Sequence, residues 1–265
     1  MSFVFSVLAL TLILYWLYVA VRKPGHWMTW LVFLILPLGM SPFWIATNDV
    51  GWFEWTKLLS VLVGSCWLIA IRSRKRFQTS WAGNILSILL GLNMLEAIAV
   101  DVLNASHCSL LNAGCGLILV LLLPKSSTEV RCTGRYGDVE YAGTNRAWII
   151  GYTLWNLTLL YQHFPMIFGH HLAVLAVPLI IGLRQPQYWL QARAFVLGID
   201  LMVLATGQRV VLKLLDTTVI QSEFGAALIV GATVIATLVC FGQAAVQAVS
   251  IQRSQDGLML ASVKA

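Results

Sequence analysis

The stretch GLNMLEAIAVD, residues 91–101, decides how the chain must fold, because it sets polar side chains inside a hydrophobic helix. The surrounding run, residues 82–103, is otherwise apolar, so Asn93, Glu96 and Asp101 fall where lipid would be expected. A carboxylate at the centre of a membrane helix costs about 2.5 to 3.5 kcal/mol on insertion scales. We therefore expect these groups to be buried in a helix bundle, paired with a partner, or protonated.

The composition is typical of an integral membrane protein. Of the 265 residues, 59% are hydrophobic and 11% are charged, whereas a typical soluble domain is about 25% charged. The formal charge of +6 does not indicate a nucleic-acid partner, because the basic residues occur singly or in short runs between apolar segments. The five cysteines form no CxxC pair, so we expect free thiols rather than a disulfide framework or a zinc ribbon.

Nine segments approach the roughly 20 apolar residues that a helix needs to cross the hydrocarbon core. The sequence therefore predicts an all-α integral membrane protein, a bundle of about nine transmembrane helices, with eight as the alternative. Residues 1–265 form one polytopic domain, in which 125–145 is a polar cytoplasmic loop or a short hairpin. The predicted helices are Phe3 to Val21, Trp27 to Thr47, Trp55 to Ile71, Ala82 to Leu103, Ala105 to Leu123, Arg146 to Phe164, Phe168 to Leu183, Trp189 to Gly207, and Glu223 to Ser250.

The basic residues predict the orientation. With an external amino terminus, the cytoplasmic segments hold fourteen of the 17 Lys and Arg residues, which leaves only Lys57, Arg209 and Lys213 outside. This asymmetry follows the positive-inside rule, so we expect a location in the inner (cytoplasmic) membrane, with a cytoplasmic carboxyl terminus. We expect the first helix to be retained, because no basic residue precedes it. Residues 208–222 could instead form an amphipathic segment in the interface.

Polar side chains also mark the sixth and eighth predicted helices. Tyr152 and Asn156 are four residues apart and therefore share a face, which could bind a solute or join helices. The eighth helix begins with WLQARA, which contains Gln191 and Arg193. The Arg193 guanidinium either snorkels to the cytoplasmic surface or pairs with a carboxylate of another helix.

The histidines raise the possibility of a metal site. His107, His163, His170 and His171 fall at predicted outer ends of helices, near Asp101. Imidazole and carboxylate are ordinary zinc ligands, but no HxxxH or HExxH spacing is present. We predict no metal site, and no nucleophile elbow, phosphate loop or dinucleotide fingerprint identifies a cofactor or a catalytic class.

Four motifs occur in order along the chain: WTKLLSVLVGSCWLIAIR, NMLEA, AWIIGYTLWN and WLQARA. Together they resemble a family of bacterial polytopic membrane proteins known as a domain of unknown function. The resemblance covers about residues 52–204 and implies a multi-helix membrane fold, but it implies no activity. The residues that match the pattern are Lys57, Asn93, Glu96, Trp155, Asn156, Trp189, Gln191 and Arg193.

Three classes of function fit these observations. A channel or transporter for an ion or small solute would use Asn93, Glu96, Asp101, Tyr152 and Asn156, with Gln191 and Arg193, as a buried polar site. A structural or assembly subunit would use the same groups to join helices. An intramembrane lipid-modifying enzyme would use the outer histidines and acids. The expected partners are the lipid bilayer and a homo-oligomer or membrane complex, for which the small residues of GAALIVGATVIA in the last helix would allow close packing.

The orientation can be tested with single cysteines introduced at Ser73 and Asn48 in a cysteine-free chain. Because fourteen basic residues mark the cytoplasmic side, a membrane-impermeant thiol reagent applied to intact cells should label position 48 and leave position 73 unlabelled. The opposite labelling pattern would show that the orientation is inverted.

Overall fold

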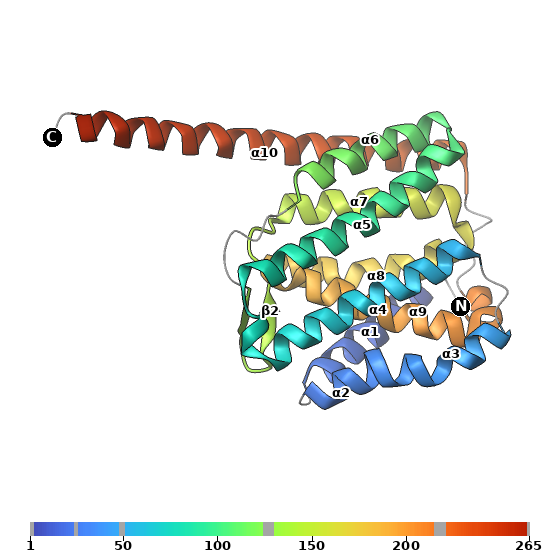
Figure 1. Ribbon diagram of the computed structural model, residues 1–265. Coiled ribbons are helices and arrows are strands. Elements are labelled where there is room, and N and C mark those ends of the chain that lie inside the picture. The colour runs from blue at the N-terminus through green and yellow to red at the C-terminus, as the bar shows by residue number, and fades with distance from the viewer. Residues whose placement is uncertain (1–2, 24–25, 48–50, 124–129, 215–220, 264–265) are drawn as a thin grey trace.

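The computed structural model describes residues 3–23, 26–47, 51–123, 130–214 and 221–263, and nearly all of them are helical (Figure 1). The second helical segment is continuous through α2, a π-helical turn (η1) and α3. The helices are α1 Phe3–Arg22, α2 His26–Trp30, η1 Leu31–Ile35, α3 Leu36–Thr47, α4 Trp52–Ser73, η2 Lys75–Phe77, α5 Ser80–Asn104, α6 His107–Leu121, α7 Arg146–His163, α8 Pro165–Arg184, η3 Pro186–Tyr188, α9 Trp189–Leu214 and α10 Glu223–Val263.

Seven helical stretches of the described chain are long and apolar enough to cross a membrane, judged by length and composition. The predicted all-α fold with membrane-compatible helices is therefore confirmed, and nine crossings stay a prediction. The two other predicted spans are α6, which has only 15 residues, and α7, which carries many buried polar residues. The seven stretches are Phe3–Arg22, Trp27–Thr47, Glu54–Ser73, Ser80–Asn104, Pro165–Arg184, Pro186–Gly207 and Glu223–Ser250.

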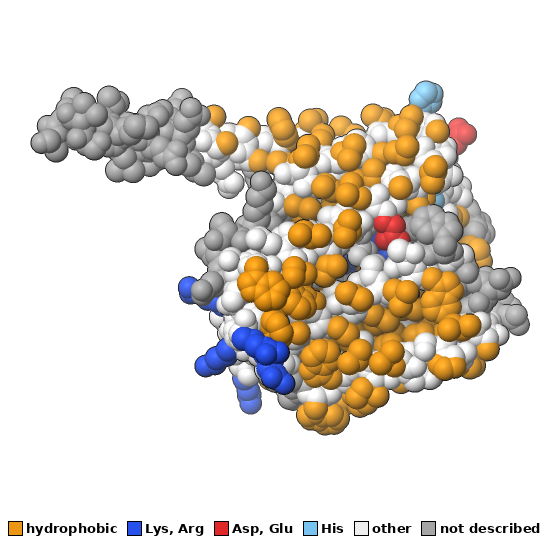
Figure 2. Space-filling model, viewed as in Figure 1, with side chains coloured by type: hydrophobic (Ala, Val, Ile, Leu, Met, Phe, Trp, Pro, Cys, Tyr) orange, Lys and Arg blue, Asp and Glu red, His pale blue; other side chains and the backbone are white. Residues whose placement is uncertain are grey.

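The helices run back and forth between two ends of the bundle, and α10 packs on α6 and α7 before it extends beyond them (Figure 1). Apolar side chains cover the face drawn in Figure 2, and Lys and Arg side chains gather at the end that holds β2. Trp16 and Leu103, for example, are 63% and 77% exposed. So much exposed apolar surface exceeds what a soluble monomer shows, and it is the surface that lipid would cover.

Local sequence signals explain where several helices begin and end. The Asn145 side chain accepts a hydrogen bond from the backbone N–H of Trp148 at the start of α7, and Ser106 caps α6 in the same way. The predicted helix end at Gly207 coincides with a kink: Gly207 has a non-helical backbone, and a second helical stretch continues α9 to Leu214. Of the predicted interfacial segment, 208–214 is thus helical, and 215–220 lies outside the described residues.

A short hairpin covers one end of the bundle. Strand β1, Arg131–Thr133, pairs antiparallel with β2, Asp138–Glu140. The turn between them needs Gly134 and Gly137, whose φ angles of 72° and 62° are in the left-handed region that favours glycine. For residues 125–145 the sequence left open a loop or a short hairpin, and the described part of this connection forms the hairpin. Residues 124–129 lie outside the described residues.

Buried charges hold the hairpin against the helices. Arg72 of α4 is 5% exposed and donates to the backbone carbonyls of Gly137, Tyr136 and Arg22 at 2.9 to 3.1 Å. Asp138 of β2 accepts an ion pair from Arg22 at 2.9 Å. The hairpin therefore closes this end of the bundle, which we call the hairpin end.

Cys132 of β1 reports whether the hairpin is docked. Burial raises the pKa of its thiol to about 11, so at pH 7.5 only about one molecule in a thousand or fewer carries the reactive thiolate. N-ethylmaleimide should therefore label Cys132 slowly, with a rate that rises about tenfold per pH unit until the pH approaches 11. Peptide mass spectrometry would measure this rate.

Arg72→Gln should release the hairpin and accelerate labelling of Cys132, whereas Arg74→Gln, which changes an exposed side chain at the same end, should leave the rate unchanged. If Cys132 in the native wild-type protein reacted as fast as it does in the chain unfolded in detergent, the docked position of the hairpin would be wrong.

Candidate functional site

A cavity of about 560 Å³ lies among α4, α5, α7, α8 and α9. This volume is within the range of about 300 to 1,000 Å³ that small-molecule sites occupy. Most of its lining is apolar, with Leu90, Trp155 and Leu197 among the largest side chains. The polar and charged residues that line it are Glu54, Lys57, Ser60, Asn93, Tyr152, Asn156, His163, His171 and Arg193.

An ion pair between α4 and α5 forms one wall of the cavity. The Lys57 ammonium lies 3.0 Å from Oε2 of Glu96, and it also donates to Oδ1 of Asn93 at 2.9 Å. Asn93 in turn donates from Nδ2 to the Ser60 hydroxyl at 3.2 Å. The carboxylate within the apolar run of α5 is thus met by a lysine from the neighbouring helix. Its second oxygen, Oε1, is buried and has no described hydrogen-bond partner.

The ion pair is partly exposed. The Lys57 and Glu96 side chains are 20% and 13% exposed, and both helices also carry exposed apolar side chains, such as Leu59 of α4 and Leu95 of α5. Other side chains of both helices, among them Val61 of α4 and Leu89 of α5, line the cavity. The cavity therefore adjoins a partly exposed ion pair between α4 and α5.

Arg193 of α9 also lines the cavity. Its side chain is buried, at 6% exposure, and Nε donates to the Tyr152 hydroxyl at 3.4 Å, a long hydrogen bond. The guanidinium carbon is 5.8 Å from the centre of the Tyr152 ring, which stacks on Trp148. Neither sequence prediction for Arg193 is correct, because it does not snorkel to the surface and no described carboxylate lies within ion-pair distance.

Two further polar residues, Asn156 and Asp200, have polar atoms without a described hydrogen-bond partner. Asn156 of α7 lines the cavity, and the structure describes no hydrogen bond for its amide. Asp200 of α9 is 2% exposed and interacts electrostatically with Arg193, but Oδ2 of Asp200 has no described hydrogen-bond partner. The Asn156 amide and the Arg193 guanidinium thus line a largely apolar cavity, and both have hydrogen-bonding groups without described partners.

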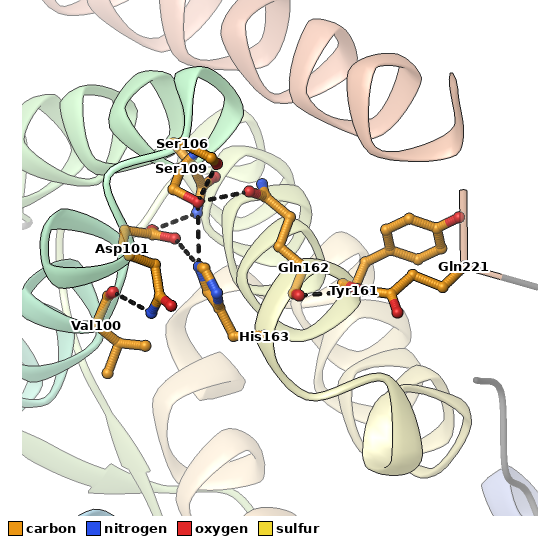
Figure 3. Close-up of polar contacts among 10 residues, drawn as sticks. Val100, Asp101, Ser106, Ser109, Tyr161, Gln162, His163 and Gln221 are labelled. Carbon is orange, nitrogen blue, oxygen red and sulfur yellow. Dashed lines mark hydrogen bonds and ion pairs between the residues drawn. The ribbon is translucent and has the colours of Figure 1, made fainter. Parts of the chain in front are cut away.

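A second polar cluster closes the end of the cavity that is opposite the hairpin (Figure 3). Asp101 of α5 is fully buried and accepts from Nδ2 of Asn112 at 2.7 Å, while its other oxygen lies 2.8 Å from Nε2 of His163. Ser109 of α6 donates to Oε1 of Gln162 at 2.8 Å. The cluster joins α5, α6 and α7, and His163 is the member that also lines the cavity.

The cluster contains serine, histidine and aspartate, but it does not have the geometry of a catalytic triad. In a triad the serine and the carboxylate bind opposite nitrogens of the imidazole ring. Here the Ser109 hydroxyl, at 3.4 Å, and Asp101 both contact Nε2 of His163. This arrangement cannot pass a proton from the serine through the ring to the carboxylate, so it supports structural joining of helices rather than acyl transfer.

The structure brings together five of the seven predicted site residues. Asn93, Tyr152, Asn156 and Arg193 line the cavity, and Glu96 adjoins it through its ion pair with Lys57. The described hydrogen bonds do not join Glu96 to Asn156, because Lys57 of α4 supplies the partner of Glu96 instead.

Two predicted site residues lie apart from the cavity. Asp101 belongs to the cluster with His163. Gln191 is 1% exposed and holds the hairpin: Oε1 accepts from the backbone N–H of Val139, and Nε2 donates to Asp138, both at 2.8 Å. Two residues after Gln191 on the same helix, Arg193 faces the cavity, so α9 links the hairpin to the cavity wall.

Lys57 and His171 are cavity residues that the sequence interpretation did not include in the site. A signal for Lys57 was present, because an ionisable residue within an apolar helix is by default a candidate functional group. Its place near the amino-terminal end of the predicted helix hid this signal. His171 lines the cavity and donates from Nδ1 to the Ile167 carbonyl at 3.2 Å. Among the described residues, no group of three His, Cys, Asp or Glu side chains could hold a metal ion.

A comparison with protein-family models identifies the family of the chain. The model described as "Family of unknown function (DUF5692)" matches residues 1–256, so the chain belongs to this family. The predicted resemblance to a family of unknown function is therefore confirmed, and a bacterial source stays a prediction. Neither the comparison with curated proteins nor that with solved structures found a match.

The ion pair predicts non-additive effects on stability. Glu96→Gln and Lys57→Gln each leave one charge mostly buried without its counter-charge, so each should lower the free energy of unfolding by about 1 to 4 kcal/mol, between the limits for exposed and buried pairs. The double variant should lose less than the sum of the two, because neither charge then remains.

Thermal unfolding in detergent would measure these differences. Glu54→Gln is the matched control, because Glu54 is exposed on α4 and should change stability by less than about 0.5 kcal/mol. Strictly additive effects of the two single substitutions would refute the ion pair.

Proposed function

We propose that this member of a family of unknown function is a membrane carrier for a small amphipathic solute. The observation that carries the proposal is the cavity of about 560 Å³, largely apolar but with Lys57, Asn93, Tyr152 and Arg193 on its walls. Ligand sites between helices combine an apolar surface with a few polar groups that orient the ligand. Polar groups inside membrane helices are expensive, and they commonly mark a substrate or ion pathway.

The closed hairpin end favours a carrier over an open channel. Arg72, Asp138 and Gln191 form a buried polar seal between the hairpin and the helices. The opposite part of the cavity is lined by the beginning of α4, with Glu54 and Trp55, and by the junction of α7 and α8. A carrier alternates between states that are open on one side, and this arrangement would be one of them.

Glu96 would be the group whose pairing with Lys57 controls the contact between α4 and α5. Its Oε2 accepts from Lys57, and its Oε1 is buried without a described partner. Loss of this pairing would loosen the contact between the two helices at the cavity wall, because an ion pair needs both charges in contact.

The alternative functions have less support. A purely structural or assembly subunit would need no cavity with unused polar groups on its wall. An intramembrane lipid-modifying enzyme would need a nucleophile with a base in reach, and the contacts of Ser109 and Asp101 with one nitrogen of His163 do not provide this relation. The proposed location is a bacterial inner membrane, with the basic hairpin end on the cytoplasmic side.

Transport can be tested with three ten-carbon solutes that differ only in the head group: decanesulfonate, decyltrimethylammonium and decylphosphocholine. All three carry permanent charges and cross lipid slowly. Proteoliposomes with the wild-type chain should release at least one of them faster than protein-free liposomes do. Release of radiolabelled solute would be measured over time.

A cavity-filling variant separates transport from leakage. A side chain at Gly64, which lines the cavity, would meet open space, so Gly64→Phe should fill part of the cavity and abolish release. Gly114 of α6 also has open space around it but does not line the cavity, so Gly114→Phe should retain release. If no solute were released faster than by protein-free liposomes, or if both variants behaved alike, the proposed carrier would be wrong.

A further inference from the structure

The described residues include two buried arginines, and the protein supplies them with different numbers of hydrogen bonds. Arg72 donates to three backbone carbonyls at the hairpin end. Arg193 is equally buried, but it makes one described hydrogen bond, at 3.4 Å to the Tyr152 hydroxyl. Nη1 is buried without a described partner in both arginines, so the difference lies in the other N–H groups: Arg72 makes three described hydrogen bonds and Arg193 makes one long one. Because a guanidinium is charged at all relevant pH values, the positive charge at Arg193 needs an anion to stabilise it.

The protein does not provide this anion at hydrogen-bonding distance. The described ion pairs join Arg22 to Asp138, Lys57 to Glu96 and His163 to Asp101, and none includes Arg193. Asp200 interacts with Arg193 electrostatically, but seven residues of helix separate them by about 10 Å along the axis. Asp200 also does not line the cavity. The donors of Arg193 that face the cavity are therefore left for a ligand.

The remaining lining defines the rest of that ligand. Lys57 is already paired with Glu96, so Arg193 is the cavity cation that has no carboxylate in contact among the described residues. One uncompensated cation suits one anionic head group. Beyond Arg193 the walls are mainly leucine, valine and aromatic side chains, such as Leu58, Val61 and Trp155. These would cover an aliphatic or isoprenoid chain rather than a hydrated ion.

The partly exposed ion pair between α4 and α5 indicates how such a molecule would arrive. The Lys57 and Glu96 side chains are 20% and 13% exposed, and exposed apolar side chains such as Leu59 and Leu95 are on the same two helices. An amphipathic molecule in the bilayer keeps its head near charged groups and its tail in hydrocarbon. It could pass between the two helices with its head directed from Lys57 toward Arg193, without leaving an apolar environment.

We propose that Arg193 binds the anionic oxygen-bearing head group of an amphipathic molecule, a carboxylate, sulfonate or phosphate with an apolar chain, that enters the cavity from the bilayer between α4 and α5. This proposal rests on the proposed carrier function and names its substrate class. The planar guanidinium can donate two parallel N–H bonds to such a head group, which a lysine cannot reproduce. Asn156, whose amide is free of described hydrogen bonds, lines the same cavity and could provide a further donor.

Binding would be measured by isothermal titration calorimetry on the full chain in nanodiscs of phosphatidylcholine. The probes are decanoate, decanesulfonate and decyl phosphate, compared with neutral decanol and cationic decyltrimethylammonium. The three anions should bind more tightly than decanol and the cation. Arg193→Gln should weaken binding of the anions by about 10- to 100-fold, as expected for loss of hydrogen bonds to a charged group, and should leave decanol binding unchanged.

Two further variants control for misfolding and for general charge effects. Arg193→Lys keeps the positive charge and should weaken anion binding less than Arg193→Gln does. Arg184→Gln, which removes an exposed arginine at the end of α8, should bind all probes like the wild type. Size-exclusion chromatography and thermal unfolding would establish that each variant is folded.

The outcomes distinguish this inference from the carrier function. If decanol and the anions bound equally, with sensitivity to Gly64→Phe but not to Arg193→Gln, the head-group site would be wrong while the amphipathic cavity would stand. If none of the probes bound, both proposals would fail. Nanodiscs containing phosphatidylglycerol identify the source of the head group. If phosphatidylglycerol reduced the binding of decanesulfonate, the site would be assigned to a bilayer lipid, and if decanesulfonate binding were undiminished, the site would be assigned to a free amphipathic anion. Either result supports an anion site at Arg193.

Discussion

The structure depends on one constraint, which is that a charge within an apolar helix needs a partner inside the protein. Glu96 meets this constraint through the Lys57 ammonium of the neighbouring helix. The pair is also the polar link between α4 and α5, and Asn93 and Ser60 extend it along both helices. Because the link occupies one edge of the two helices, the space behind it stays open as the cavity. The cost of placing a carboxylate within an apolar helix is thus offset by its contact with Lys57.

The same constraint is met differently at the two ends of the bundle. At the hairpin end, Arg72 uses backbone carbonyls of the turn, and Asp138 is held by Arg22 and Gln191. At the other end, Asp101 is satisfied by an amide and an imidazole from α6 and α7. Both arrangements are sealed by neighbouring protein groups. In the cavity between them, Arg193 makes one long described hydrogen bond where Arg72 makes three, and this difference separates a candidate binding site from a structural contact.

Close helix packing around the cavity comes from small residues opposite large aromatic ones. A side chain at Gly116 of α6 would overlap the indole of Trp155, and one at Gly182 of α8 would overlap Trp189. These tryptophans and Tyr152 form a contiguous aromatic group beside Arg193. Substituting either glycine would require an aromatic ring to move, because a Cβ atom at either position would overlap it. The walls of the site are therefore held by packing as well as by hydrogen bonds.

The sequence by itself determined the helical segments and the depth of the polar groups. Hydropathy marks the apolar runs, and the 3.6-residue period shows which residues of one helix share a face, so Asn93, Glu96, Tyr152 and Asn156 could be proposed as site residues. Only the tertiary structure decided which faces meet. Periodicity contains no information about the rotation of one helix against another, so it could not show that Glu96 pairs with Lys57, that Asp101 turns away toward His163, or that Gln191 binds a hairpin while Arg193 faces the cavity. Those partners are 39, 62 and more than 50 residues apart in the chain, and they are brought together by packing alone.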